Sequence, residues 1–349
     1  MSSRVLITGA AGFIGQALAS HLLRTTPYTV VLTDVVPPPV PANIPHPENA
    51  VSVTADLRTE SAQVVAEAGG ERSHDDGRID GPVAVFVLHG IMSGRAEADF
   101  ELGMAVNVDA TRALLDALRL YTQRDPRAIP PRVVYASSLA VFGPPYVGPI
   151  TEATMPIPQS SYGAEKVVCE VLVSEYSRRG WIDGLVCRFP TVSVRPGAPA
   201  PAASAFLSGL VREPLNREVA VVPIEDDGFK SWICSPRTLL ENLVRAMEVE
   251  ADRLSDGEGR QRRIVNLPGI TVTIEEMISA LGAKVGKEAL KFIERKKDPA
   301  AERILMSWPT DFDVSVAEDM GFHRDEGFGQ IIGDYLDSLG GLDKTPLGK

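Results

Sequence analysis

Three side chains in the middle of the chain have the types and spacing needed to move a proton. Tyr162 and Lys166 are four residues apart, so on a helix they share one face, a turn apart. A phenol is a poor base at neutral pH because its ordinary pKa is about 10, and a nearby ammonium group stabilises the phenolate. Ser138 follows a predicted strand at 132–136 and could hydrogen-bond a reacting oxygen. The trio predicts acid–base chemistry on an alcohol or a carbonyl.

A second motif, LITGAAGFIG, places Gly9, Gly12 and Gly15 between an apolar run and a stretch with helical spacing. Strand, glycine turn and helix in this order are the context that a dinucleotide-binding loop requires. The alternative is an ordinary glycine turn. Gly9 permits the turn, Gly12 allows close approach of the backbone, and Gly15 lets helix and strand pack. A pyrophosphate would lie over the helix start near Phe13, where backbone N–H groups are unpaired.

Asp34, at the end of the second predicted strand, bears on the choice of cofactor. A carboxylate there can accept hydrogen bonds from the adenosine ribose and would repel a 2′-phosphate. No arginine or lysine lies in the glycine loop, so the pattern favours NAD over NADP. The alternative is that Asp34 only opens the proline-rich loop at 37–41. Asp56 and Leu57, just after the third strand, are placed to meet the adenine edge.

The elements that must position these residues alternate along the first half of the chain. Continuous β-branched runs predict strands buried on both faces, and the segments between them have helical spacing. The strands are expected at 5–7, 30–33, 51–53, 83–88, 132–136 and 185–189, and the helices at 15–23, 59–68, 99–121 and 161–179. This order predicts an α/β fold, a Rossmann-type doubly wound parallel sheet with helices on both faces.

The second half is less regular and predicts a smaller mixed lobe that binds substrate. We expect a loop at 196–201, helices at 204–212, 273–281 and 328–339, and a strand at 264–268. The domains are therefore a cofactor domain at 1–190 and a mainly substrate-binding lobe at 191–349, with some segments returning to the first domain. The segment 68–82, rich in Gly, Asp and charge, is expected to be an exposed insertion.

The composition narrows the class of protein. The 349 residues carry a net charge of −11, which argues against a nucleic-acid partner because phosphate backbones are bound by basic patches. The three cysteines are too few and scattered for a disulfide framework or a zinc site. We expect no metal. No apolar run is long enough to span a bilayer and no signal peptide precedes the first strand, so we expect a cytoplasmic protein.

Taken together, these motifs resemble the extended short-chain dehydrogenases/reductases of the NAD-dependent epimerase/dehydratase type, over nearly the whole chain. The resemblance implies a proton acceptor at Tyr162, its partner at Lys166 and a hydroxyl donor at Ser138. It also implies further cofactor contacts. The matching and implied positions are Thr8–Gly15, Asp34, Asp56, Leu57, Asn107, Ser137, Ser138, Tyr162, Gly163, Lys166, Arg188, Pro190 and Val192, with Phe13 and Ile14 inside the glycine turn. His89 is a further candidate cofactor contact, although it departs from the family's pattern.

Within that family, the stretches 93–117, 161–184 and 188–216 resemble NAD-dependent dehydrogenases of four-carbon sugar acids. Sugar-nucleotide epimerases usually carry a run like Asn-Val-Tyr-Gly-Pro after strand six, where this chain has Thr-Val-Ser-Val-Arg-Pro at 191–196. They also commonly have a tyrosine where this chain has Phe142. Both differences argue against a nucleotide-sugar substrate. His89 stands where small residues are usual; it could touch cofactor or substrate, or pack locally. Asn107, inside the long helix, could hold a backbone group or a water near Ser138.

An aldonate substrate needs a cation for its carboxylate, and a guanidinium binds a carboxylate with two hydrogen bonds. Arg195, just past strand six, is our candidate, with a loop-anchoring role as the alternative and Arg212 and Arg237 as competitors. Ser93, in the loop after strand four, could bind a substrate hydroxyl.

These observations predict an NAD-dependent oxidoreductase that oxidises the C2 hydroxyl of a small sugar acid. The rivals are an NAD-dependent sugar-nucleotide epimerase or dehydratase and a non-catalytic NAD(H)-sensing protein. The resemblance further implies a homodimer formed through the helices at 99–121 and 161–179, with Leu114, Leu118, Val168 and Leu172 as apolar positions on them.

Overall fold

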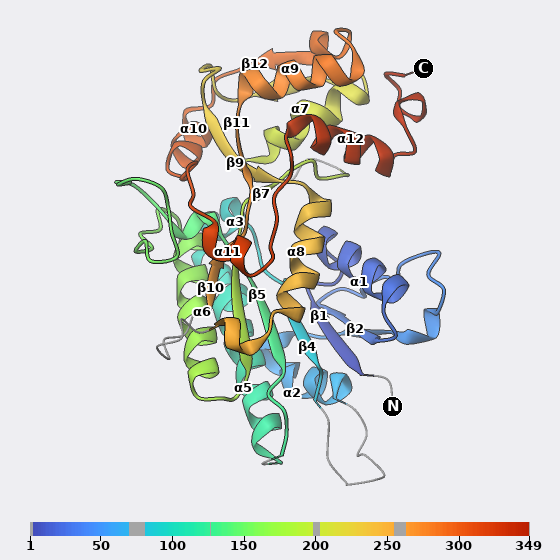
Figure 1. Ribbon diagram of the computed structural model, residues 1–349, viewed down its shortest axis with the longest axis vertical. Helices are drawn as coiled ribbons and strands as arrows, with labels where there is room; N and C mark the ends of the chain where they lie inside the picture. The colour runs from blue at the N-terminus through green and yellow to red at the C-terminus, as the bar shows by residue number, and fades with distance from the viewer. Residues whose placement is uncertain (1–2, 70–80, 126, 198–202, 255–262, 349) are drawn as a thin grey trace. The chain divides into compact units, whose positions relative to one another are not determined.

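The predicted alternation of strands and helices is present in the computed structural model, which describes residues 3–69, 81–125, 127–197, 203–254 and 263–348 (Figure 1). All six predicted strands form, most of them a residue or two longer than expected: β1 (Arg4–Thr8), β2 (Thr29–Asp34), β3 (Ala50–Thr54), β4 (Ala84–Val87), β5 (Arg132–Ser138) and β6 (Asp183–Phe189). The helices of this half are α1 (Phe13–Thr25), α2 (Leu57–Ala68), α3 (Ser93–Ala98), α4 (Phe100–Gly103), α5 (Ala110–Gln123) and α6 (Ser161–Arg178).

Seven of the described strands form one sheet in the order β10-β6-β5-β4-β1-β2-β3, in which β10 is Ile264–Asn266. The pairs β1–β2, β1–β4, β2–β3 and β4–β5 are parallel. The order reverses between β1 and β4, which is the point where ligands bind in doubly wound sheets. The fold class predicted from the sequence, a Rossmann-type parallel sheet, is confirmed.

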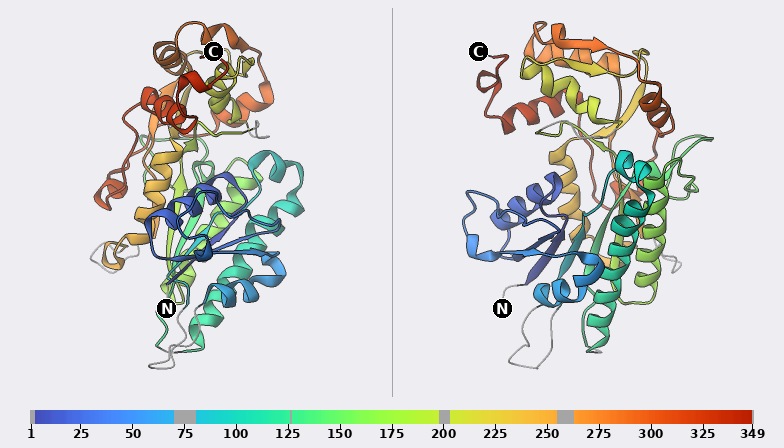
Figure 2. Two further views of the ribbon diagram at one scale, coloured as in Figure 1. Left: turned by 90° about the vertical axis from the view of Figure 1, so that its right-hand side faces the viewer. Right: turned by 180° about the vertical axis from the view of Figure 1, so that it is seen from behind.

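The two faces of this sheet are covered by different helices (Figure 2). One face packs on α2, α5 and α6, where Val64, Leu114 and Val173 are fully buried in a common core with strand residues such as Leu6. The other face packs on α1, whose Leu18 and Leu22 are also fully buried. Strands buried on both sides explain the continuous apolar runs in the sequence.

The chain divides into two compact units that interleave along the sequence. Unit 1 comprises 1–138, 160–188 and 243–265, and unit 2 comprises 139–159, 189–242 and 266–349. The predicted boundary at 190/191 and the assignment of the second lobe to substrate binding remain predictions. The expected insertion at 68–82 and the loop at 196–201 lie partly outside the described residues.

Unit 2 contains more short elements than the sequence predicts. They are β7 (Thr191–Val192), α7 (Ala205–Leu215), β8 (Ala220–Val222), β9 (Lys230–Cys234), α8 (Pro236–Glu248), β11 (Ile270–Thr273), α9 (Ile274–Val285), β12 (Ile293–Arg295), α10 (Pro299–Met306), α11 (Ser315–Asp319) and α12 (Phe328–Ser338), with α8 continuing into unit 1. The strands form a sheet β11-β9-β7 and a pair β12-β8. A capping box between Thr273 and Glu276 starts α9.

The expected helix at 99–121 forms as a continuous helical run over 100–123, but its hydrogen-bond pattern changes along the run. The chain forms α4, then a π-helical segment at Met104–Asp109, then α5. Ser93, expected in a loop, is the first residue of α3 and is buried. Such short helices, with Gly94 at the second position of α3, carry too few apolar positions to produce a periodic pattern.

Candidate active site

The glycine turn after β1 is packed too closely to hold side chains. Gly9 has a φ of +67°, and a Cβ there would lie 2.7 Å from the backbone of His89. A Cβ on Gly15 would lie 2.5 Å from the Gly9 carbonyl oxygen. Gly12 is the N-cap of α1 and provides no side-chain cap, so N–H groups in the first turn of this helix could bind an anion. This geometry fits a pyrophosphate, with Phe13, Ile14 and Gly15 as the first residues of α1.

A cavity of about 660 Å³ adjoins the turn and is lined entirely by unit 1. Its size is that of a small-molecule or cofactor site. Six predicted cofactor residues line it: Gly9, Gly12, Asp34, Asp56, Leu57 and His89. The sequence analysis missed several other lining residues, among them Arg58, Ile91, Arg95, Leu102 and Val106. For Arg95, the available signal was a cation shortly after the fourth strand.

Two carboxylates that line this cavity, those of Asp34 and Asp56, differ in their hydrogen-bond partners. Asp34 accepts hydrogen bonds from the backbone N–H groups of Ala11 (3.0 Å) and Val35 (2.8 Å), one on each oxygen. Each carboxylate oxygen can accept more than one hydrogen bond, so Asp34 retains acceptor capacity. Asp56 caps α2 and pairs with Arg58 at 2.5 Å, and the hydrogen bonds from Arg58 lower the pKa of the Asp56 carboxyl.

Tyr162 and Lys166 lie on α6 with both side chains buried. The Lys166 ammonium donates to the Ala136 carbonyl (2.7 Å) and lies 5.5 Å from the Tyr162 ring centre. It thereby joins α6 to the end of β5, of which Ser138 is the last residue. Lys166 also lies 4.8 Å from the ring of Tyr135, but burial raises the pKa of Tyr135 well above its ordinary value, so that phenol stays protonated. The arrangement can stabilise negative charge on Tyr162.

His89 is held as a neutral ring between two threonines. The hydroxyl of Thr111 donates to the Asn107 carbonyl (2.8 Å), so it accepts from Nε2 of His89 (3.2 Å). Nδ1 is then unprotonated and accepts from the Thr8 hydroxyl at 2.8 Å, a shorter contact than the one this hydroxyl makes with the Phe86 carbonyl at 3.3 Å. Burial, with a smaller contribution from the Lys166 charge, lowers the pKa of His89 to about 3. Both ring nitrogens are engaged in local bonds, as the packing alternative expects, while the ring also lines the cavity.

A buried ion pair between Arg188 and Glu170 holds the end of β5 through Ser137. Arg188 donates to both oxygens of Glu170, at 2.9 and 2.7 Å, and both side chains are only 2 % exposed. Ser137, which precedes Ser138, donates to the same carboxylate at 2.5 Å. Bidentate pairing of this kind fixes geometry as well as charge. The sequence analysis named Ser137 and Arg188 through the resemblance and missed Glu170.

The predicted substrate contact Arg195 belongs to unit 2. It follows β6, as expected; between the two the chain passes Pro190 and forms β7, which contains Val192 and belongs to the smaller sheet. Its role as a substrate contact remains a prediction. Arg195 Nε donates to the Val192 carbonyl (3.1 Å), and its backbone N–H donates to Ser208 (3.0 Å). The side chain is half-buried.

The competing cations are both engaged by carboxylates within unit 2. Arg212 is buried, pairs with Glu213 at 2.5 Å and donates to the Arg195 carbonyl. Arg237 is exposed and lies 3.3 Å from Asp334.

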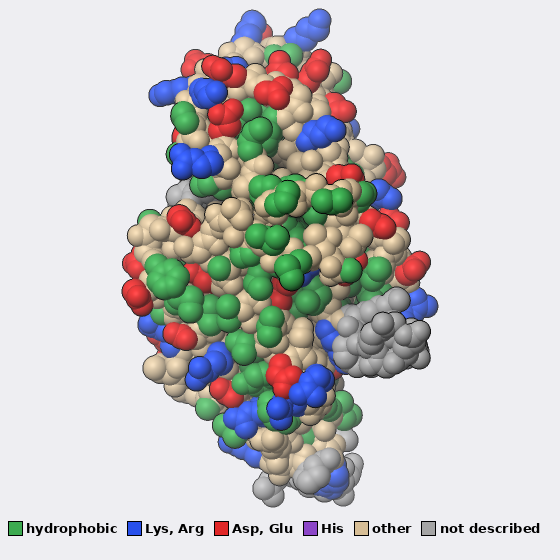
Figure 3. Space-filling view, turned by 90° about the vertical axis from the view of Figure 1, so that its left-hand side faces the viewer, with side chains coloured by type: hydrophobic (Ala, Val, Ile, Leu, Met, Phe, Trp, Pro, Cys, Tyr) green, Lys and Arg blue, Asp and Glu red, His purple; other side chains and the backbone are tan. Residues whose placement is uncertain are grey.

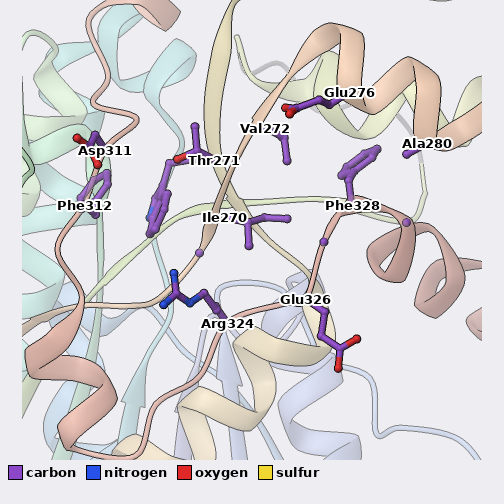
Figure 4. Close-up of a pocket in the computed structure, with 14 residues that line it drawn as sticks. Ile270, Thr271, Val272, Glu276, Ala280, Asp311, Phe312, Arg324, Glu326 and Phe328 are labelled. Atoms are coloured by element: carbon purple, nitrogen blue, oxygen red, sulfur yellow. The ribbon is translucent and has the colours of Figure 1, made fainter.

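A second cavity, of about 590 Å³, lies within unit 2 (Figure 4). Its wall includes Trp232 and Phe312, whose rings stack at 4.8 Å. Its charged lining residues are Glu276, Asp311, Arg324 and Glu326, and three of these four are acidic. This charge disfavours an anionic substrate in this cavity. Among the described residues, no group of three histidine, cysteine, aspartate or glutamate side chains could hold a metal ion.

The apolar positions cited for a dimer interface separate into two classes. Leu114 and Leu118 are fully buried in the core of unit 1, which corrects their assignment, because the sheet uses that face of α5. Leu172 also packs against this core. Val168 and Val171 are 43 % and 63 % exposed, on the outer side of α6, and hydrophobic side chains reach the surface on this side (Figure 3). None of the described helices has the length and apolar character needed to cross a bilayer.

Comparison with known proteins agrees with this fold. Residues 5–228 match the model of the NAD dependent epimerase/dehydratase family. The chain is 39 % identical to D-erythronate dehydrogenase of Cupriavidus necator and 34 % identical to that of Haemophilus influenzae, over 96 % of this chain and 98–99 % of theirs. A solved structure described as a nucleoside-diphosphate-sugar epimerase from Agrobacterium tumefaciens is 35 % identical, with a TM-score of 0.86 over 97 % of this chain and 95 % of that chain.

A Rossmann-type sheet, a glycine turn at its switch point and a helix carrying Tyr162 and Lys166 define a dinucleotide-dependent oxidoreductase. The chain belongs to the NAD-dependent epimerase/dehydratase family, and its cofactor is NAD.

Proposed function

We propose that the protein is a dehydrogenase that oxidises the C2 hydroxyl of a small sugar acid, D-erythronate or a close four-carbon relative. The observation that carries this proposal is the similarity to two D-erythronate dehydrogenases along almost the full length of all three chains. The buried Tyr162–Lys166 pair at the end of β5 supports it, because oxidation of an alcohol requires a base for the hydroxyl proton.

In this reaction each group of the chain has a distinct task. Tyr162 accepts the proton of the substrate hydroxyl, and Ser138 hydrogen-bonds the same oxygen. Lys166 stabilises the phenolate through its charge and binds the nicotinamide ribose. When bound, NAD supplies the acceptor for the hydride that leaves C2. The products are a 2-oxo acid, NADH and a proton. The glycine turn and Asp34 hold the pyrophosphate and the adenosine ribose.

We assign the substrate carboxylate to Arg195. Arg195 lies a few residues past β6, and ligands of open α/β sheets bind at the carboxyl ends of the strands. Arg212 and Arg237, which lie 2.5 and 3.3 Å from carboxylates, are the alternatives. Truncating one partner of a buried charge pair costs about 2–5 kcal/mol, so Arg195→Ala should raise the KM for the sugar acid about 30-fold or more. Arg237→Ala is the matched control and should leave KM within about threefold, as expected for an exposed charge.

The decisive experiment is oxidation of D-erythronate with NAD, followed by NADH absorbance. We expect one NADH per acid consumed, a 2-oxo acid as product, and poor turnover of neutral four-carbon alcohols. A primary isotope effect with deuterium at C2, and none with deuterium at C3, would locate the oxidised carbon. Failure to oxidise any four-carbon sugar acid would refute the substrate class, and an isotope effect at C3 alone would refute the position.

The second candidate is a sugar-nucleotide epimerase, which the 35 % identity to the Agrobacterium tumefaciens structure favours. An epimerase returns the hydride within each turnover, so NADH does not accumulate. Conversion of a nucleotide sugar without net NADH would therefore replace the proposed function with this one.

We further propose a cytoplasmic homodimer, with the outer side of α6 in the interface. Val168 and Val171 provide the exposed apolar surface. Light scattering at micromolar concentration should give twice the mass of the chain, and Val171→Asp should shift the protein toward the monomer. A monomeric wild type would refute this assembly.

A further inference from the structure

Glu165 is a buried acid on the helix that carries Tyr162 and Lys166. Glu165 is only 1 % exposed and immediately precedes Lys166 on α6. One carboxylate oxygen accepts a hydrogen bond from the Asn107 side-chain amide at 2.5 Å. The other oxygen lies against Gly103, where a Cβ would overlap it, and has no hydrogen-bond partner among the described residues. Burying a carboxylate in this way is costly, so its retention calls for a reason.

Asn107 links this carboxylate to the backbone at Ile91. The Asn107 side-chain oxygen accepts from the Ile91 N–H at 2.9 Å, and its amide nitrogen donates to the Ile91 carbonyl at 3.2 Å. The second hydrogen of the same nitrogen goes to Glu165. The amide is therefore held at both ends, by the backbone on one side and by the carboxylate on the other. Its orientation is fixed, because a flipped amide would lose all three bonds.

The segment that Asn107 holds forms part of the wall of the cofactor cavity. His89, Gly90 and Ile91 all line that cavity. A Cβ on Gly90 would lie 2.8 Å from the Asn107 oxygen and 3.9 Å from the Lys166 ammonium nitrogen. The segment therefore passes directly over both side chains. The π-helical turn at Met104–Asp109 provides Asn107 at this point, and such turns often occur at functional sites.

We propose that Glu165 is a positioning residue that, through Asn107, fixes the cavity wall at Ile91 relative to the helix carrying Tyr162 and Lys166. This inference rests on the proposed roles of those two residues but not on the identity of the substrate. The carboxylate restrains the Asn107 amide, and the amide restrains the backbone against which the cofactor binds. Removing the carboxylate leaves a buried amide donor unsatisfied and loosens the wall.

Four variants separate positioning from simple packing. Glu165→Ala removes the acceptor, whereas Glu165→Gln keeps a side-chain oxygen for Asn107. Gly103→Ala leaves Glu165 in place but displaces its carboxylate, because the new methyl group overlaps the second oxygen. Val173→Ala is the matched control: it truncates another fully buried side chain of α6, two turns further on.

The readout is NADH affinity, measured by fluorescence titration without substrate, together with hydrogen exchange at Ile91. We expect Glu165→Ala to raise the NADH Kd roughly 10-fold, which is the effect of one lost buried hydrogen bond, and to speed exchange at Ile91 by a similar factor. Gly103→Ala should act in the same direction. Glu165→Gln and Val173→Ala should remain within about threefold of wild type in both measurements.

Two results would overturn the proposal. Equal effects of Glu165→Ala and Val173→Ala would mean that packing alone matters. Equal effects of Glu165→Ala and Glu165→Gln would mean that the negative charge, rather than the bond to Asn107, matters. If Glu165→Ala does not fold, Gly103→Ala takes its place in the comparison. The proposal then requires a higher NADH Kd for Gly103→Ala than for Glu165→Gln, and equal values would overturn it. Because no substrate is added, these measurements stand even if D-erythronate is not oxidised.

Discussion

Replacing His89 should remove a pH dependence that the neutral ring gives to the stability of the protein. The folded state holds this ring with a pKa of about 3, against an ordinary value of 6.5. Between these two pH values the unfolded chain binds a proton at this position that the folded chain does not. The stability contributed by neutral His89 is therefore complete above pH 6.5 and falls as the pH drops toward 3.

The magnitude follows from the size of the shift. Each pH unit within this window costs about 1.4 kcal/mol of unfolding free energy, so the loss between pH 6.5 and pH 5 is at most about 2 kcal/mol. The ring keeps some exposure to solvent, which weakens the desolvation, and we expect about 1–2 kcal/mol. His89→Gln offers a donor and an acceptor to Thr8 and Thr111 but does not titrate.

The assay is urea unfolding of wild type and His89→Gln at pH 7, 6 and 5, followed by circular dichroism. Other titrating groups contribute equally to both proteins, so the difference between the two pH slopes isolates His89. The wild type should lose about 1–2 kcal/mol more than the variant between pH 7 and 5. Parallel slopes would show that the folded state does not keep His89 neutral.

Three further predictions concern the site and its support. Tyr162→Phe should lower kcat by about 100- to 10,000-fold while NADH binding persists, as measured by turnover and fluorescence titration; full activity would remove the proposed base. Asp34→Ala should narrow the preference for NAD over NADP in kcat/KM, and an unchanged ratio would argue that Asp34 serves only the turn. Glu170→Ala should cost about 3–5 kcal/mol in urea unfolding because it leaves Arg188 buried without its carboxylate, whereas replacing both residues by apolar side chains should cost less. Equal costs for the single and double replacements would contradict this reading of the pair.

Local patterns in the sequence were enough to predict the strands and the main helices of unit 1. The glycine turn could be recognised because strand, turn and helix are consecutive, and Gly9, Gly12 and Gly15 occupy the positions that the turn requires. Tyr162 and Lys166 could be paired because a helix brings residues four apart to one face. These relations depend on the backbone period and on neighbouring residues, so sequence reasoning reaches them.

Residues of unit 2 were harder to predict because its elements are short. A strand such as β8, with three residues, or a helix such as α11, with five, contains too few positions for a period to show. The strand β7, which precedes Arg195, was not predicted for this reason: it has two residues, and it belongs to a different sheet from β6.

The sequence by itself determined the fold class of this protein, its glycine turn and the helix that carries Tyr162 and Lys166. Only the tertiary structure decided which polar residues of that helix are buried. Glu165 and Glu170 look in the sequence like solvent-facing positions, yet their partners Asn107, Ser137 and Arg188 lie 58, 33 and 18 residues away along the chain. The same holds for Leu114, whose apolar side chain is equally suited to a sheet or to a partner. A side chain's type limits what it can contact, but burial is decided by segments that the folded chain brings together from distant positions.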